Sequence, residues 1–134
     1  MSLGYGGFCH MIAEDASSVL YTYYCFNWNI ERSRNPNHIT DGYITIRKDC
    51  LVEPEIHEKI KRFPNGKKKK IVKRIVRDVN IRRRIEEGSV EIENSSFAWY
   101  LIGGYDRVAL LLTYNIFREY QETGKLPEKT GYFT

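Results

Sequence analysis

Hydrophobic positions in the first third of the chain follow a pattern that predicts β-strands. Residues 17–29 (SSVLYTYYCFNWN) are the stretch richest in β-branched and aromatic side chains, which favour a pleated, half-buried surface. The two sides of such a strand would carry Val19, Tyr21, Tyr23 and Cys25 on one side, and Leu20, Thr22, Tyr24, Phe26 and Trp28 on the other. Because both sides are largely apolar, we expect a central strand that is covered on both faces.

Shorter stretches predict further strands. GYITIR (residues 42–47) follows a polar loop and is interpreted as the hairpin partner of the first strand, while SVEIE (89–93) alternates as a short strand. The glycine-rich start, GYGGFCHMI (4–12), predicts a short strand with a bulge or turn at its paired glycines. FAWYLI (97–102) fits either a strand or a buried helical turn.

The spacing of apolar residues changes in the middle of the chain and predicts helices there. Glu53 and Pro54 are typical of a helix start, and residues 64–66 (PNG) break that element. A longer helix is predicted from Lys67 to about Asn80. A kink or a second short helix is predicted to begin near Asn80, with a stop at Gly88. The apolar positions that suggest the longer helix are Ile71, Val72, Ile75, Val76 and Val79.

The C-terminal third predicts a core helix over residues 107–123. Asp106 is a typical N-cap, and Gly124 followed by Pro127 is a typical stop. Apolar residues occupy more than half of this helix's circumference, and a polar tail follows. Residues 1–134 therefore predict one α+β domain: a small, mainly antiparallel sheet packed by the C-terminal helix, with amphipathic basic helices in the middle of the chain.

Composition and cysteine content indicate the cellular compartment of the protein. No stretch approaches the roughly 20 apolar residues that a membrane span needs, and no secretory signal begins the chain. Three widely spaced cysteines, Cys9, Cys25 and Cys50, indicate buried thiols in a reducing compartment rather than a disulfide scaffold. We expect a cytoplasmic protein that does not bind membranes; its oligomeric state is open.

Charge is concentrated in residues 47–84, which hold 15 of the 21 Lys and Arg residues and five acids. On a helix these cations would form a ridge suited to phosphate contacts, which predicts nucleic-acid binding as an alternative function. A solvated helix face or a site for an acidic protein explains the same ridge. The residues of the ridge are Lys67, Lys68, Lys69, Lys70, Lys73, Arg74, Arg77, Arg82, Arg83 and Arg84.

No motif predicts catalysis. His10, His38 and His57 are too scattered for a metal site, and buried structural thiols explain the cysteines better than a nucleophile does. GGYD (103–106) lacks the Lys-Ser/Thr of a phosphate-binding loop. We expect a protein that is not an enzyme and that binds neither metal nor cofactor.

Aromatic and acidic residues instead suggest a surface for a protein partner. Tyr24 and Trp28 suit a core, a base-stacking platform or a protein interface. Glu86, Glu87, Glu91 and Glu93 would add an acidic face. Polar residues of the following loop, Asn27, Asn29, Arg32, Arg34, Asn35 and His38, would form a hydrogen-bonding rim.

The layout resembles small, single-domain bacterial immunity proteins, which neutralise a toxin encoded beside them. The resemblance rests on the aromatic strand YTYYCFNWN, the strand opening DGYITI, the charged helices and the closing helix DRVALLLTYNIFREYQETG. It implies inhibition of a toxin by stoichiometric binding, without chemistry. One departure is the net charge of +4, because immunity proteins against nucleases are usually acidic.

Overall fold

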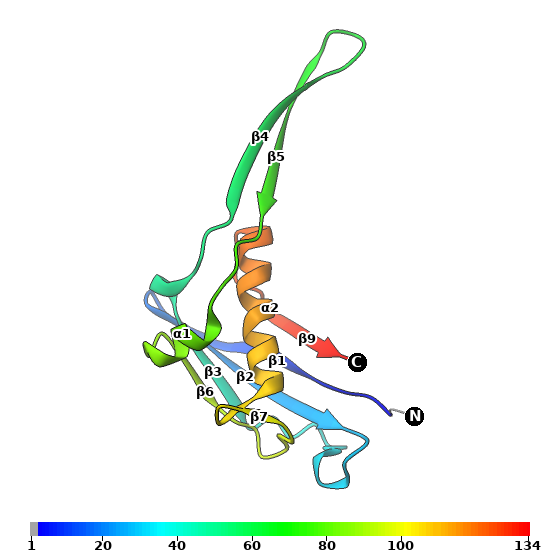
Figure 1. Cartoon of the computed structure of the whole chain (residues 1–134), viewed down its shortest axis with the longest axis vertical. Coiled ribbons are helices and arrows are strands. Elements are labelled where there is room, and N and C mark those ends of the chain that lie inside the picture. Colours follow the sequence, from blue (N-terminus) through cyan, green and yellow to red (C-terminus); the bar gives the residue numbers. More distant parts are fainter. Residues whose placement is uncertain (1–2) are drawn as a thin grey trace.

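A five-stranded antiparallel sheet with the order β6-β3-β2-β1-β9 forms the centre of the computed structural model, which describes residues 3–134 (Figure 1). Its strands are β1 (Tyr5–Glu14), β2 (Ser18–Asn27), β3 (Gly42–Arg47), β6 (Val90–Glu93) and β9 (Lys129–Phe133). The predicted hairpin is confirmed, since Tyr21 of β2 pairs with Ile44 of β3. The predicted α+β class, with a mainly antiparallel sheet packed by the C-terminal helix, is also confirmed.

Helix α2 (Arg107–Thr123) crosses one face of this sheet and begins and ends where the sequence predicts. The Asp106 carboxylate accepts a hydrogen bond from the Val108 amide at 3.0 Å, and Gly124 ends the helix with a φ of 79°. The core between α2 and the sheet contains Val19, Tyr21, Tyr23, Cys25, Ile44, Ile46, Val108, Leu112, Ile116 and Phe117. One side of β2 is therefore fully buried.

The other side of β2 is not covered by a helix. Tyr24 and Phe26 are half-buried there, and Trp28 just beyond the strand is 37% exposed. The expectation of a strand covered on both faces is therefore wrong. A strand side can be apolar because another element covers it, or because its aromatic rings form an exposed surface. The alternation of residues in the sequence does not distinguish these two cases.

Two of the predicted basic helices are instead the strands of a hairpin. Strands β4 (Glu55–Arg62) and β5 (Lys68–Ile75) pair antiparallel, from Glu55 opposite Ile75 to Arg62 opposite Lys68. This hairpin extends beyond the C-terminal end of α2, away from the main sheet (Figure 1). The predicted helix start at Pro54 and the predicted helix from Lys67 to about Asn80 are both wrong.

The turn between these strands explains the difference. The Gly66 amide donates to the Phe63 carbonyl at 3.0 Å, and the Phe63 amide donates to the Lys67 carbonyl at 2.8 Å. Gly66 has a φ of +83°, which glycine adopts without strain. Residues 64–66 therefore reverse the chain instead of only ending a helix, and the β-branched residues on either side pair across the hairpin.

The remaining elements connect the sheet to α2. Of the kink or short helix predicted near Asn80, the structure has the short helix, α1 (Ile81–Glu86), with the Asn80 side chain accepting from the Arg83 amide at 3.1 Å. Strands β7 (Leu101–Ile102) and β8 (Tyr105–Asp106) form a small hairpin before α2, and 3-10 turns lie at Glu31–Ser33 and Lys48–Cys50. The C-terminal tail contributes the edge strand β9, which the sequence did not predict. Over residues 3–134, no helix has the length and apolar character to cross a membrane.

Candidate binding surfaces: an aromatic face and a basic arm

Six rings lie together on the side of the main sheet that α2 leaves uncovered, and we call this surface the aromatic face. Its rings form a connected series, with centroids 4.7 Å apart for Phe8–Phe133 and 5.7 Å apart for Phe8–Tyr24. The series continues at 6.4 Å for Tyr24–Phe26 and 6.3 Å for Phe26–Trp28. The aromatic face consists of Phe8, Tyr24, Phe26, Trp28, His38 and Phe133.

Strand register brings these rings together. Phe8 of β1 lies opposite Tyr24 of β2 on one side and opposite Gly131 of β9 on the other. A Cβ at Gly131 would lie 2.5 Å from the Phe8 ring, so the glycine provides the space in which that ring lies across β9. The missing side chain of one strand thus lets an aromatic side chain of its neighbour cover the sheet.

The loop between β2 and β3 adds the sixth ring. His38 stacks on Tyr24 with centroids 4.9 Å apart and an interplanar angle of 6°. Asn35 holds the loop in place, because its amide nitrogen donates to the Cys25 carbonyl at 3.0 Å and its amide oxygen accepts from the Ile39 amide at 2.7 Å. Burial of the Tyr24 ring raises the pKa of its hydroxyl.

The predicted polar rim is only partly present. Asn27 and Asn35 are buried and bond to the loop backbone, so these two amides do not form a rim. Arg32, Arg34 and His38 are exposed beside the aromatic face. A buried asparagine that orders a loop and an exposed one that binds a partner look the same in the sequence.

The four predicted acids divide into two pairs. Glu91 and Glu93 lie opposite Thr45 and Tyr43, so they share the uncovered side of the sheet with the aromatic face, at the opposite edge. Glu86 and Glu87 belong to the end of α1, where they bind Arg82 at 3.7 Å and Arg83 at 2.9 Å. The structure thus brings Tyr24, Trp28, Glu91 and Glu93 to one side of the sheet, but not Glu86 and Glu87.

Sequence reasoning missed Phe8, Phe26 and Phe133 as members of a surface. The exposed fraction reaches 60% for Phe133, and it is 47% for Ile39, which follows His38 in the chain. A signal for Phe8 was present, because pairing GGFC with YYCF in an antiparallel register places two rings side by side. No comparable signal existed for Phe133, whose position depends on the unpredicted strand β9.

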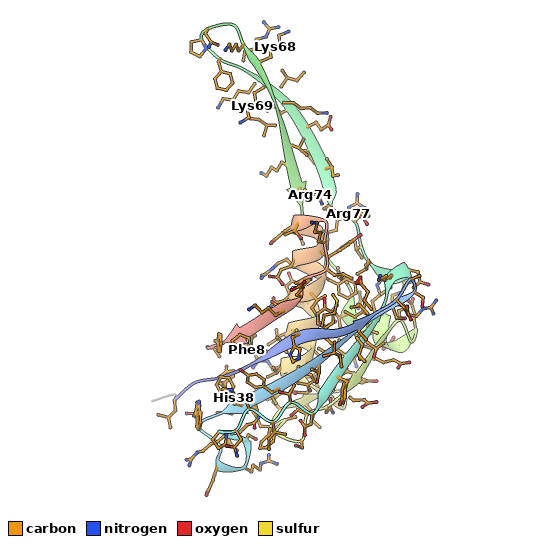
Figure 2. All side chains as sticks on the ribbon, turned by 180° about the vertical axis from the view of Figure 1, so that it is seen from behind. Phe8, His38, Lys68, Lys69, Arg74 and Arg77 are labelled. Atoms are coloured by element: carbon orange, nitrogen blue, oxygen red, sulfur yellow. The ribbon has the colours of Figure 1, made fainter. Side chains whose placement is uncertain are left out.

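The second surface is the β4–β5 hairpin, residues 55–75, which we call the basic arm (Figure 2). It carries nine Lys and Arg residues and two Glu residues. Every residue from 55 to 74 is exposed. The arm therefore has a formal charge of +7, whereas the rest of the chain, with 12 cations and 15 acids, has a charge of −3.

The predicted single cationic ridge is divided by the fold. Lys67, Lys68, Lys69, Lys70, Lys73 and Arg74 belong to the basic arm, Arg77 follows it, and Arg82, Arg83 and Arg84 belong to α1. Figure 2 shows Lys68 and Lys69 toward the tip of the arm and Arg74 and Arg77 at its base. The prediction of a helical ridge is wrong because residues 68–75 form a strand, and only Arg82, Arg83 and Arg84 of the set lie on a helix.

The base of the arm is fastened to the end of α2 by Gln121. Its side-chain oxygen accepts from the Arg77 amide at 2.7 Å, and its side-chain nitrogen donates to the Arg77 carbonyl at 3.0 Å. The Arg74 guanidinium donates to the Gln121 carbonyl at 3.2 Å, where it meets the negative end of the helix dipole. Gln121 is fully buried, so these contacts fix the base of the arm against the body.

The buried polar groups have structural roles. Tyr23 donates to the Asp106 carboxylate at 2.7 Å and accepts from the Ser95 amide at 2.9 Å, which joins the sheet to the start of α2. Burial raises the pKa of the Cys9 thiol to about 12 and moves the pKa of the Cys25 thiol upward as well. Both thiols are therefore protonated near neutral pH and are poor nucleophiles. Residues 3–134 contain no group of three or more His, Cys, Asp or Glu side chains placed to hold a metal.

A hollow of about 270 Å³ lies between α1 and the start of α2. Its walls include Ile85, Ile102 and Leu110, with Arg82 and Glu86 among its polar residues. Those two side chains already pair with each other at 3.7 Å. The hollow therefore presents no converging set of free polar groups for a small ligand.

Comparison with known proteins returns no match to a family model, a curated protein or a solved structure. The resemblance to immunity proteins consequently rests on the layout of the sequence.

Proposed function

We propose that this chain is a non-catalytic protein-binding module, and most concretely an immunity protein that inhibits a cognate toxin by stoichiometric binding. The aromatic face is the observation that supports the proposal. Its rings lie in contact on an uncovered sheet, with Trp28 37% and Phe133 60% exposed. Aromatic side chains supply large, rigid apolar area, and exposed groups of them are typical of interface centres.

The acids on the same side of the sheet favour a partner with positive charge. Glu91 and Glu93 lie at the edge strand β6, on the side that carries Tyr24. The binding surface of a complementary partner would have an apolar centre and positively charged residues along its edge. A toxin that cleaves nucleic acid has such a margin around its active site, because its substrate is a polyanion. Covering that site would exclude the substrate without any reaction.

We also propose a cytoplasmic location. Cys9, Cys25 and Cys50 are all free and buried. Free thiols are typical of a reducing compartment, where an immunity protein would meet an incoming or newly made toxin.

A growth assay in bacteria tests the proposal. The polypeptide encoded beside this chain in its genome is expressed from an inducible promoter, alone and together with the chain. We expect arrest of growth by the neighbour alone, restored growth with the chain, and a one-to-one complex in size-exclusion chromatography. A neighbour that is harmless, or that remains toxic in the presence of the chain, would overturn the immunity function.

Surface variants test where the partner binds. Trp28→Ala and Tyr24→Ala are each expected to weaken the complex by about 2 kcal/mol, or roughly 30-fold, as interface-centre residues do. Tyr114→Ala is the matched control, since Tyr114 is 40% exposed and belongs to α2, which packs on the opposite face of the sheet. Equal affinities for all three variants would exclude the aromatic face as the binding surface.

A further inference from the structure

The basic arm lies outside the proposed protein interface, and burial of its own apolar side chains contributes little to its stability. Its two eight-residue strands, each about 26 Å long at the usual rise per residue, extend away from the body (Figures 1 and 2). Ile56, Ile60 and Val72 on this arm are 54%, 66% and 54% exposed. An isolated two-stranded hairpin is at best marginally stable in water. Such an element is better explained by a ligand that covers it than by a contribution to the core.

The cations of the arm are largely without acidic partners. Lys70 bonds to Glu58 at 3.1 Å, and within residues 3–134 this is the one salt bridge made by a Lys or Arg of the arm. The arginines of α1 differ, because Arg82 and Arg83 each pair with a glutamate of their own helix. Arg74 donates to the Gln121 carbonyl at the base of the arm. The other seven of the nine arm cations, all except Lys70 and Arg74, thus keep their charge available for a polyanion.

Both faces of the ribbon carry this charge. Residues directly opposite each other in a hairpin point to the same face, so the register assigns each of the eight cations of the two strands to a face, and Lys67 lies in the turn between them. One face carries Lys59, Lys61, Lys69 and Lys73, and the other carries Arg62, Lys68, Lys70 and Arg74. A flat acidic surface would contact only one of these sets, whereas a groove bounded by two phosphate backbones would contact both.

The dimensions and charge of the arm fit a duplex groove. The major groove of B-DNA is about 12 Å wide and admits a two-stranded β-ribbon. The major groove of duplex RNA is too deep and narrow for side chains to enter. We propose that the basic arm binds double-helical DNA by entering the major groove, with the lysines and arginines of its two faces contacting the phosphates on either side.

Fluorescence anisotropy with a labelled, mixed-sequence DNA duplex tests the proposal. Binding is titrated from low to physiological salt with the full chain. We expect a dissociation constant of about 10⁻⁶ M at physiological salt and a straight log–log plot, with a slope of about −0.9 for each phosphate contacted. A wild-type chain that does not bind the duplex at physiological salt would overturn the proposal.

Two matched variants locate the site. The arm variant replaces Lys61, Lys68, Lys69 and Lys73 with Gln, and the body variant replaces Arg82, Arg83, Arg118 and Lys125 with Gln, so each lowers the formal charge by four. We expect the arm variant to bind about 100-fold more weakly, with a slope shallower by up to about 3.6, and the body variant to retain the wild-type slope. Equal losses in the two variants would mean that net charge alone drives binding, which also overturns the proposal.

Competitors identify the class of ligand. Unlabelled DNA duplex is expected to displace the probe at lower concentration than duplex RNA or poly-L-glutamate of equal charge. Displacement by duplex RNA or poly-L-glutamate at the same concentration as DNA would contradict groove binding and point to RNA or an acidic protein. Because the four arm lysines are exposed, the arm variant should unfold at the wild-type temperature, which separates lost binding from lost folding.

Discussion

The side chain of Gln121 bonds to both the amide and the carbonyl of Arg77, at 2.7 and 3.0 Å. Gln121 belongs to the last turn of α2, whereas Arg77 follows the last strand of the basic arm. A primary amide is suited to this double contact, because it has one acceptor and one donor side by side. The pair therefore connects the arm to the body across 44 residues of sequence.

Gln121→Ala is expected to lower the free energy of unfolding by about 1–3 kcal/mol, since it leaves the Arg77 backbone groups without their partner. Urea unfolding measures the loss, and amide hydrogen exchange should rise at residues 74–79. Glu122→Ala is the control, because Glu122 is exposed and its ion pair with Arg118 at 3.8 Å contributes little. Unchanged stability in Gln121→Ala would argue against this attachment.

The ring stack on the aromatic face gives a second prediction. His38 has a φ of 50°, so an alanine at this position would add backbone strain to the loss of the ring. His38→Asn avoids this complication, because asparagine tolerates the left-handed region. We expect the free energy of unfolding to fall by about 0.5–1.5 kcal/mol, the range measured for aromatic pairs. Iodide should also quench tyrosine fluorescence more strongly, because the Tyr24 ring is uncovered. If quenching of tyrosine fluorescence does not change, the ring does not cover Tyr24.

The hydroxyl of Tyr23 gives a third prediction. Tyr23→Phe removes a donor to Asp106 and an acceptor for the Ser95 amide, all in the buried core. The free energy of unfolding should fall by about 1–3 kcal/mol, because buried polar groups lose their hydrogen-bond partners. Tyr43→Phe, at a tyrosine that is 37% exposed, should change stability by less than about 0.5 kcal/mol. Similar losses in both variants would contradict the structural role of the Tyr23 hydroxyl.

A fourth prediction concerns acid stability. Burial acts to raise the pKa of Asp41, but hydrogen bonds from Ser96 and Ser95 outweigh it and leave the pKa below its usual value of 3.8. Since the folded state holds the carboxylate more strongly ionised than the unfolded state does, this stabilisation is present above pH 3.8 and is lost as the pH falls through the lowered pKa.

Asp41→Asn should therefore be less stable than the wild type at neutral pH, by about 1 kcal/mol or less because the carboxyl is partly solvated. The difference should shrink as the pH falls from 3.8 through the lowered pKa of Asp41. Urea unfolding of both proteins across this range measures it. Ser96→Ala removes the side-chain hydroxyl that donates to the Asp41 carboxylate and should behave similarly. A deficit that stays constant with pH would show that ionisation of Asp41 plays no part.

The error in the middle of the chain has an identifiable cause. Ile71, Val72, Ile75, Val76 and Val79 fall at helical spacing, yet these residues are also β-branched, which favours strands. The Asn65-Gly66 pair between two such runs is a hairpin signal. Helical spacing and β-branching therefore predict different elements here, and the hairpin forms although both of its faces remain exposed.

Local sequence by itself determined α2, from the Asp106 cap to Gly124, together with the strands around Tyr21 and Ile44 and the short helix after Asn80. Each of these depends on capping groups or on alternation within a few residues, so local chemistry suffices. Tertiary structure decided which residues meet: Phe133 reaches Phe8 only through the pairing of β9 with β1, and Lys61 faces Lys69 only through the arm's register. Pairing between distant segments depends on the whole chain, because a strand's partner is not encoded in its own alternation.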